Sequence, residues 1–266
     1  MSNPALSVLI PCYNGGQYLP AALASITSYP DKHLYEIIIV NDGSTDEATI
    51  GLLNSLQQQG YQVINQENKG PAAARNNAAK NAKGEYLLLL DSDNKIRHNY
   101  IKKGVDILRQ NPEISIVHGK PVFFGNVTPS RLFDTGKFDM AKMLNCNYID
   151  NCTLIRKSAW DMLGGQDEKS FVEDWEFWIR AGIADLKFFY LEEDCFDYRI
   201  VSDSLTDSLA KERWDSEAQY IYNKHVQLLT EQYKRLYIEK LIYHQDQQQP
   251  FRSFVKYFFK KYFKKK

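Results

Sequence analysis

The chain reads Tyr86-Leu87-Leu88-Leu89-Leu90-Asp91-Ser92-Asp93, an apolar run that ends in two carboxylates. An unbroken apolar run of this length is typical of a parallel strand that is buried on both faces. Ligands bind open α/β sheets beyond the carboxyl ends of such strands. Because residues two apart on a strand share a face, Asp91 and Asp93 together offer the oxygen ligands that a hard divalent cation prefers. Asp and Ser are also ordinary turn residues, so the neighbouring segments decide how this motif is interpreted.

Strands and helices alternate along the chain before this stretch. Apolar runs predict strands over 6–10 and 36–40, and a shorter third strand over 61–64. Helices are expected between the strands, over 18–28, 47–59 and from the loop at 68–71 to about residue 81. Four strands alternating with three helices predict an α/β fold, a Rossmann-like, mostly parallel sheet flanked by helices.

Polar residues follow the ends of the predicted strands. Tyr13 and Asn14 follow the first strand, Asp42 follows the second, and Asp91 and Asp93 follow the fourth. The carboxyl ends of parallel strands meet at one edge of a sheet, so this arrangement predicts a nucleotide-binding crevice.

The composition is that of a globular protein, with 44% hydrophobic and 25% charged residues. We expect a sheet-containing domain over residues 1–205 and an α-helical extension over residues 206–266. Charge is distributed unevenly, because the last sixteen residues hold seven basic and no acidic side chains, whereas the remainder carries 33 acidic and 26 basic ones. An acidic main domain argues against a nucleic-acid partner.

Cysteine usage and hydropathy predict a cytoplasmic protein. The four cysteines form no Cys-x-x-Cys pair and have no zinc-like spacing with histidines, which favours reduced thiols: Cys12, Cys146, Cys152 and Cys195. The first residues show no signal-peptide pattern, and no stretch approaches the roughly 18 apolar residues that a membrane-spanning helix needs.

The segment Phe251–Lys266 has an amphipathic pattern. Apolar residues recur at helical spacing along one face, namely Phe251, Phe254, Val255, Phe258, Phe259 and Tyr262. Arg252, Lys256 and Lys260 lie across from this face, and three lysines follow. This pattern predicts a helix in peripheral contact with an anionic membrane, at the inner face of the cell membrane. The alternative is an amphipathic helix packed on protein.

Six blocks of sequence, taken in order, resemble the family 2 glycosyltransferases of the GT-A fold. They are Ser7–Asn14, Val40–Asp46, Asn68–Gly70 with Ala74-Arg75-Asn76, Asp91–Asp93, Gly164–Asp167 and Glu173–Trp175. The resemblance spans about residues 5 to 205. It implies an inverting, metal-dependent enzyme of the hexosyltransferase type that takes a sugar from a nucleotide diphosphate donor.

The resemblance also assigns residues to the donor and the metal. Asp93 would coordinate Mn²⁺ or Mg²⁺ directly, and Asp91 would lie nearer the ribose and the metal shell. Asp42 would contact uracil; capping of the next helix is the structural alternative for this residue. The other donor-binding residues implied are Pro11, Tyr13, Asn14, Arg75, Ser92, Arg199 and Ser204.

The acidic pair Glu173-Asp174 matches the position of the family's catalytic base. Inverting transfer needs a carboxylate that removes the proton of the acceptor hydroxyl, and Asp174 is the matching residue. Glu173 would orient it or touch the acceptor, and Trp175 is the aromatic residue suited to a sugar face. The structural alternative is a charged helix start, where acidic residues are favoured.

One position departs from the family pattern. Family members often have Tyr-Arg-x-His where this chain has Tyr198-Arg199-Ile200-Val201, and valine cannot ligate a metal. The metal shell would then need donor phosphate oxygens and water, or Asp203. His98 and His118 are substitutes only by their proximity in sequence, and a structural role is expected for both.

The sequence therefore predicts transfer of a sugar, from a UDP-sugar, to a glycan or lipid-linked acceptor in cell-surface polysaccharide assembly. Two alternatives remain. A nucleotidyltransferase would usually show a glycine-rich loop after the first strand, where this chain has Pro11-Cys12-Tyr13-Asn14. A degenerate, nucleotide-binding scaffold would not need the acidic residues Asp91, Asp93 and Asp174.

Overall fold

The computed structural model describes residues 3–128, 132–201, 205–228, 230–231 and 234, without the side chains of 205–214. The chain divides into two compact units, Met1–Glu217 and Ala218–Lys266. The site residue Ser204, the alternative ligand Asp203 and the segment Phe251–Lys266 lie outside the described residues.

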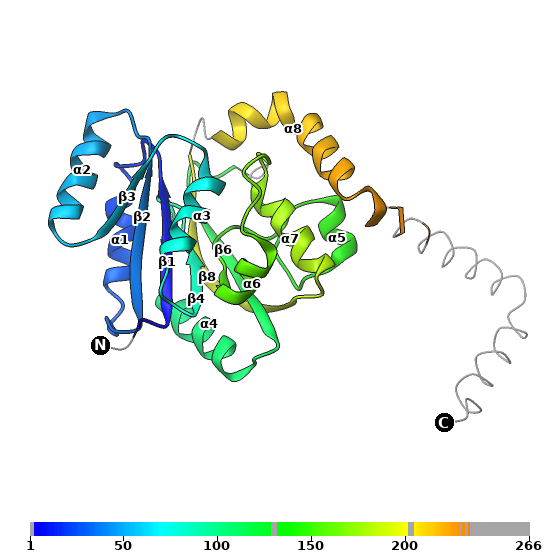
Figure 1. The fold of residues 1–266 in the computed structure, drawn as a ribbon, viewed down its shortest axis with the longest axis horizontal. Helices are drawn as coiled ribbons and strands as arrows, with labels where there is room; N and C mark the ends of the chain where they lie inside the picture. Colours follow the sequence, from blue (N-terminus) through cyan, green and yellow to red (C-terminus); the bar gives the residue numbers. More distant parts are fainter. Residues whose placement is uncertain (1–2, 129–131, 202–204, 229, 232–233, 235–266) are drawn as a thin grey trace, which may run out of the picture. The chain divides into compact units, whose positions relative to one another are not determined.

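The first unit begins with the predicted alternation of strands and helices (Figure 1). Its order is β1 (Leu6–Cys12), α1 (Leu19–Thr27), β2 (Tyr35–Asp42), α2 (Glu47–Gln58), β3 (Gln62–Gln66), α3 (Pro71–Asn81) and β4 (Tyr86–Leu89). The elements that follow are β5 (Lys95–Ile96), α4 (His98–Gln110), β6 (Ile114–Gly125), α5 (Met140–Asn145), β7 (Leu154–Arg156), α6 (Lys157–Leu163), α7 (Glu173–Ile183) and β8 (Lys187–Ile200). The last helix, α8 (Leu205–Lys224), begins in the first unit and ends in the second.

The strands form one sheet in the order β3-β2-β1-β4-β7-β6-β8-β5. Parallel pairs join β1 to β2 and β4, β2 to β3, and β6 to β8. Strand β7 is antiparallel to β4 and β6, and β5 is antiparallel to β8. The prediction of a mostly parallel sheet is confirmed, and β7 is an antiparallel strand inserted beside β4.

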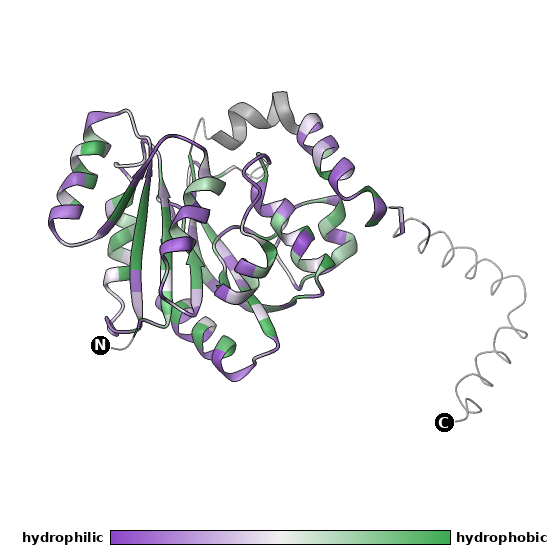
Figure 2. Ribbon diagram, viewed as in Figure 1, coloured by the Kyte–Doolittle hydropathy of each residue, from purple (hydrophilic) through white to green (hydrophobic). Residues whose placement is uncertain are grey.

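The apolar strands form the core because both faces of the sheet are covered. Side chains of β1 and β4 such as Val8, Ile10 and Leu88 are fully buried with residues of α1, α2 and α4. Helix α3 packs against β1 and β2, and its many alanines allow a close approach. Figure 2 shows apolar strands flanked by helices whose outer faces are polar.

Helix starts in this unit follow local capping chemistry. The Asp46 carboxylate caps α2 by accepting a hydrogen bond from Thr49 N at 2.8 Å. Asp42, for which capping of this helix was the structural alternative, therefore does not cap α2. Within the described part of the chain, no helix combines the length and apolar character needed to span a membrane.

Candidate active site

The site is built at the carboxyl ends of β1, β2 and β4, which are neighbours in the sheet. Asn14 joins the loops after β1 and β2, because its Oδ1 accepts hydrogen bonds from Thr45 N (2.8 Å) and Asp46 N (3.1 Å). The backbone of Asn14 is left-handed, with φ +50°, a conformation that asparagine tolerates. Tyr13 is 44% exposed beside it and so presents its ring to solvent, whereas Pro11 lies within β1.

Asp42 holds the loop that begins α3. Its carboxylate is buried and accepts hydrogen bonds from Lys69 N and Gly70 N, both at 2.9 Å, and from Gln66 Nε2 at 2.8 Å. The prediction that Asp42 contacts uracil stays a prediction. The geometry shows a carboxylate that fixes the loop before α3.

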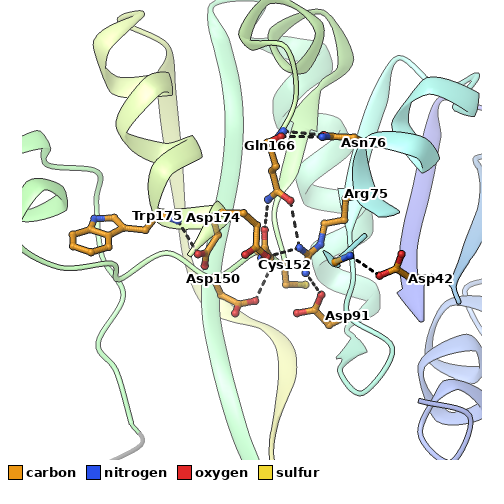
Figure 3. A network of polar contacts seen from close by, with 12 residues as sticks. Asp42, Arg75, Asn76, Asp91, Asp150, Cys152, Gln166, Asp174 and Trp175 are labelled. Carbon is orange, nitrogen blue, oxygen red and sulfur yellow. Dashed lines mark hydrogen bonds and ion pairs between the residues drawn. The ribbon is translucent and has the colours of Figure 1, made fainter. Parts of the chain in front are cut away.

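Arg75 on α3 joins the two acidic motifs (Figure 3). Its Nη2 lies 2.5 Å from Asp91 Oδ1 and its Nη1 lies 2.7 Å from Glu173 Oε1. Burial lowers the pKa of Arg75, but the charges of Asp91 and Glu173 outweigh burial and raise it. The guanidinium is only 3% exposed, which argues against the direct nucleotide contact predicted for it.

Asp93, unlike Asp91, forms no side-chain ion pair with another described residue. Burial, followed by the charge of Asp91, raises the pKa of Asp93 to about 6. Arg199 lies close by, because its Nε donates to the backbone oxygen of Asp93 at 3.0 Å. Its guanidinium also lies over the rings of Tyr18 (4.6 Å) and Phe124 (4.4 Å), which fixes its position.

A divalent cation fits this donor set in part. Asp93 is a carboxylate short of positive charge, which a hard cation would supply. Among the described residues, however, no three His, Cys, Asp or Glu side chains are grouped to hold a metal. His98 and His118 therefore do not complete a site with the two aspartates. His98 lies 3.0 Å from Ser28, and His118 is buried in β6 beside aromatic rings.

Asp174 lies in the first turn of α7 and is half-buried. Its Oδ2 accepts a hydrogen bond from Asn147 Nδ2 at 2.8 Å, and its Oδ1 accepts one from Trp175 N at 2.7 Å. Burial, followed by the charge of Glu173, raises the pKa of Asp174 to about 7. A carboxylate with a pKa near neutrality suits proton abstraction from a hydroxyl.

The residues beside Asp174 differ from the predicted acceptor contacts. Trp175 is 1% exposed, and its Nε1 donates to Met143 O at 2.6 Å. Its ring belongs to the core, so the predicted contact with a sugar face is not supported. Glu173 is also buried, and it contacts Arg75 and Asn151. The prediction that Glu173 orients Asp174 stays a prediction.

The Gly164–Asp167 loop is hydrogen-bonded to α3 and to Asn151, which in turn donates to Glu173 of the acidic pair. Asn76 Oδ1 accepts a hydrogen bond from Gln166 N at 2.8 Å, and Gln166 Nε2 donates to Asn151 Oδ1 at 2.6 Å. Gly165 has a φ of +77°, and a Cβ there would lie 2.3 Å from Asn76 Oδ1. Only glycine therefore permits this approach.

Sequence reasoning missed four polar residues of the site: Asn147, Asp150, Asn151 and Gln166. Gln166 was inside a recognised motif but had no assigned role. The other three lie in the loop between α5 and β7, where a concentration of polar residues before a strand was the only available signal. Ser92, predicted to bind donor, lies between Asp91 and Asp93, and its hydroxyl is close to Gly15.

Comparisons with known proteins identify the family. Residues 7–163 match the family model described as Glycosyl transferase family 2, and residues 86–260 match Glycosyl transferase family group 2. An uncharacterized glycosyltransferase of Haemophilus influenzae is 32% identical over 190 residues, which cover 67% of this chain and 72% of that protein. The poly-beta-1,6-N-acetyl-D-glucosamine synthase of Staphylococcus epidermidis is 29% identical over 184 residues, which cover 64% of this chain and 43% of the synthase.

Solved structures show the same fold. S. aureus TarS 1–349 in complex with UDP-GlcNAc matches with a TM-score of 0.63 and 21% identity, over 76% of this chain and 60% of TarS. The mannosyltransferase PcManGT of Pyrobaculum calidifontis, in complex with GDP-Man and Mn²⁺, matches with a TM-score of 0.63 and 16% identity, over 85% of this chain and 65% of that chain. The chain thus spans less than two thirds of either solved chain. The sequence and fold together place it in glycosyl transferase family 2, as a glycosyltransferase of the GT-A fold.

Proposed function

We propose that this glycosyltransferase moves a sugar, with inversion, from a nucleotide diphosphate donor to a hydroxyl of a glycan or lipid-linked acceptor. The single observation that carries the proposal is Asp174, a hydrogen-bonded carboxylate whose pKa is raised to about 7. UDP-sugars are the proposed donors because the TarS structure named above holds UDP-GlcNAc. A role in cell-surface polysaccharide assembly is supported by the similarity to a polysaccharide synthase.

On the donor side, the exposed ring of Tyr13 and the loop shaped by Asn14 and Asp42 are proposed to bind the base and ribose. Arg199 is proposed to bind the diphosphate, because its guanidinium is held beside Asp93. Asp93, with Asp91, would hold Mn²⁺ or Mg²⁺. Such an ion acts as a Lewis acid that stabilises charge on a diphosphate leaving group.

On the acceptor side, Asp174 is proposed to accept the proton of the attacking hydroxyl. The hydroxyl oxygen forms a bond to the anomeric carbon while the bond from that carbon to the phosphate oxygen breaks. The electron pair of the broken bond leaves on the diphosphate, and the proton passes to Asp174. Asn147 fixes one oxygen of this carboxylate, and Glu173 is held by Arg75 beside it.

The proposal is tested by the release of UDP from UDP-GlcNAc with Mn²⁺ and a panel of glycan and lipid-linked acceptors. Asp174→Asn should reduce transfer by about 10²- to 10⁴-fold, the usual contribution of a general base. It should leave UDP binding unchanged. Asp194→Asn is the matched control, because Asp194 is an exposed acid whose carboxylate forms a 3.7 Å ion pair with Arg97.

Three outcomes would contradict parts of the proposal. Full transfer by Asp174→Asn would remove Asp174 as the base. Metal-dependent nucleotide binding without any transfer, across UDP- and GDP-sugars, would favour the degenerate-scaffold alternative. Formation of a nucleotide sugar from a nucleoside triphosphate and a sugar phosphate would favour the nucleotidyltransferase alternative.

A further inference from the structure

The loop between α5 and β7 supplies three polar side chains to the site. Asn147 donates to Asp174 Oδ2 at 2.8 Å, and Asn151 donates to Glu173 Oε1 at 3.4 Å. A second contact with α7 holds the loop, because Trp178 Nε1 donates to Ile149 O at 2.9 Å. Its geometry is therefore tied to the acidic pair on α7.

Asp150 is the third of these side chains, and it forms no ion pair within the part of the chain that the structure describes. Its Oδ1 accepts a hydrogen bond from Cys152 N at 2.8 Å, which fixes the carboxyl group. Within the described residues, its Oδ2 has no hydrogen-bond partner. Asp91, by contrast, is paired with Arg75. A fixed carboxyl oxygen without a protein partner is suited to a ligand.

Asp150 lies between the two ends of the proposed reaction centre. In Figure 3 its carboxyl group lies between those of Asp174 and Asp91. Burial, followed by the charges of Asp91 and then Asp174, raises the pKa of Asp150 to about 8. The charges of Asp91 and Asp174 both act on this carboxyl group, which therefore lies near both acids.

The chemistry of inverting transfer determines what occupies this position. The sugar that is transferred lies between the departing diphosphate and the attacking hydroxyl, on whose side the base lies. Asp91 and Asp93 are proposed for the first of these ends and Asp174 for the second. A carboxyl group between them is placed to meet the hydroxyl groups of the sugar itself.

We propose that Asp150 binds a hydroxyl group of the transferred sugar and so contributes to the choice of sugar. This inference rests on the proposed function. It concerns the sugar and not the nucleotide. Comparing the binding of a nucleotide sugar with that of the nucleoside diphosphate alone therefore distinguishes the role of Asp150 from the roles of Asp91 and Asp93. Asparagine keeps a hydrogen-bonding group at this position, whereas alanine removes it.

The test is calorimetric binding, with Mn²⁺, of two ligand pairs, UDP with UDP-GlcNAc and GDP with GDP-mannose. For the pair whose sugar the wild type binds, Asp150→Ala should weaken binding of the nucleotide sugar about tenfold, the usual effect of one lost hydrogen bond. The nucleoside diphosphate should bind as to the wild type. Asp150→Asn should restore much of the lost affinity, which a merely structural role would not predict.

Several results would overturn the inference. Equal weakening of both members of a pair would place Asp150 at the diphosphate, and unchanged binding of both with a raised acceptor KM would place it at the acceptor. If Asp150→Ala does not fold, Asp150→Leu, which also removes the hydrogen-bonding group but leaves a side chain of similar size, replaces it. An Ala or Leu variant that binds the nucleotide sugar as tightly as the wild type and retains its sugar preference overturns the inference. Asp106→Asn, an acid on α4 paired with Lys102, is the control.

A failure of the proposed function gives a different result. The wild type would then bind neither nucleoside diphosphates nor nucleotide sugars with Mn²⁺, and the role of Asp150 would fall with it. Failure of the inference alone leaves the wild type able to bind and transfer, with a sugar preference that Asp150→Ala does not change.

Discussion

The guanidinium of Arg75 lies 2.7 Å from the carboxylate of Glu173, although 98 residues separate them in the sequence. The same group contacts Asp91. One buried arginine therefore connects the acid after β4 to the acid beside Asp174. We interpret Arg75 as a residue that fixes the distance between the proposed donor side and the proposed base side of the site.

Replacing Arg75 by Met should destabilise the protein strongly. The substitution leaves Asp91 and Glu173 without their cation, and breaking a buried pair costs about 3–5 kcal/mol of unfolding free energy. Urea denaturation measures the change. Arg97→Met is the matched control, because Arg97 forms ion pairs at a side chain that is 39% exposed, where such pairs contribute about 0–1 kcal/mol.

The coupling between Arg75 and Glu173 gives a second readout of the same prediction. The double variant Arg75→Met/Glu173→Gln should lose less stability than the sum of the single variants, because Gln removes one of the unpaired charges. Equal losses in Arg75→Met and Arg97→Met would show that the buried cation does not hold this site together.

The pH dependence of transfer should follow Asp174. Asp174 must be deprotonated to act as the proposed base, and its pKa is raised to about 7, so kcat/KM should fall as the pH drops below about 7. A pH–rate profile with saturating Mn²⁺ measures this limb. A profile that stays flat down to about pH 5 would contradict the raised pKa, because an ordinary aspartate titrates near 3.9.

The free energy of unfolding should also depend on pH through Asp174, and the raised pKa determines the direction of the change. The folded pKa of Asp174 lies above the unfolded value, so the unfolded state releases its proton first as the pH rises. Asp174 therefore lowers the free energy of unfolding progressively between about pH 4 and pH 7. Asp174→Asn should be more stable than the wild type above about pH 7, and the difference should shrink towards pH 4.

The sequence predicts the first half of the molecule well because that half depends on local patterns. The apolar runs that form β1, β2 and β4 are buried on both faces and carry the polar loops that follow them. Motif order also led to the acids Asp91, Asp93 and Asp174. Predicting these features requires only that a strand, its end and the following helix be recognised in the sequence.

The contacts between distant segments could not be predicted in the same way. Strand β7 pairs with β4 across 60 or more residues, and this pairing brings Asp150 towards Asp91. Likewise, the burial of Trp175 depends on the α5 segment, where Met143 accepts its hydrogen bond. An acidic pair followed by an aromatic residue looks the same in the sequence whether the ring faces a sugar or the core.

Asp93 should be needed for metal-dependent nucleotide binding. Asp93→Asn removes the carboxylate that lacks a cation, so UDP binding with Mn²⁺ should weaken while UDP binding without metal stays the same. Calorimetry with and without Mn²⁺ separates the two. Unchanged metal dependence in Asp93→Asn would exclude Asp93 as a ligand, and Asp194→Asn serves as the control because Asp194 is exposed.

The C-terminal segment Phe251–Lys266 should bind anionic vesicles if its sequence pattern reflects membrane contact. Each basic residue near an anionic surface contributes about 1 kcal/mol. Replacing Lys264, Lys265 and Lys266 by Gln should therefore weaken sedimentation with phosphatidylserine vesicles by about 10²-fold. Replacing Lys102, Lys103 and Lys157 by Gln, three lysines from other parts of the chain, removes equal charge and should have little effect. Raised salt should weaken the wild type in the same direction as the tail variant. If the wild type does not sediment with these vesicles at low salt, the apolar stripe is better explained by packing on protein.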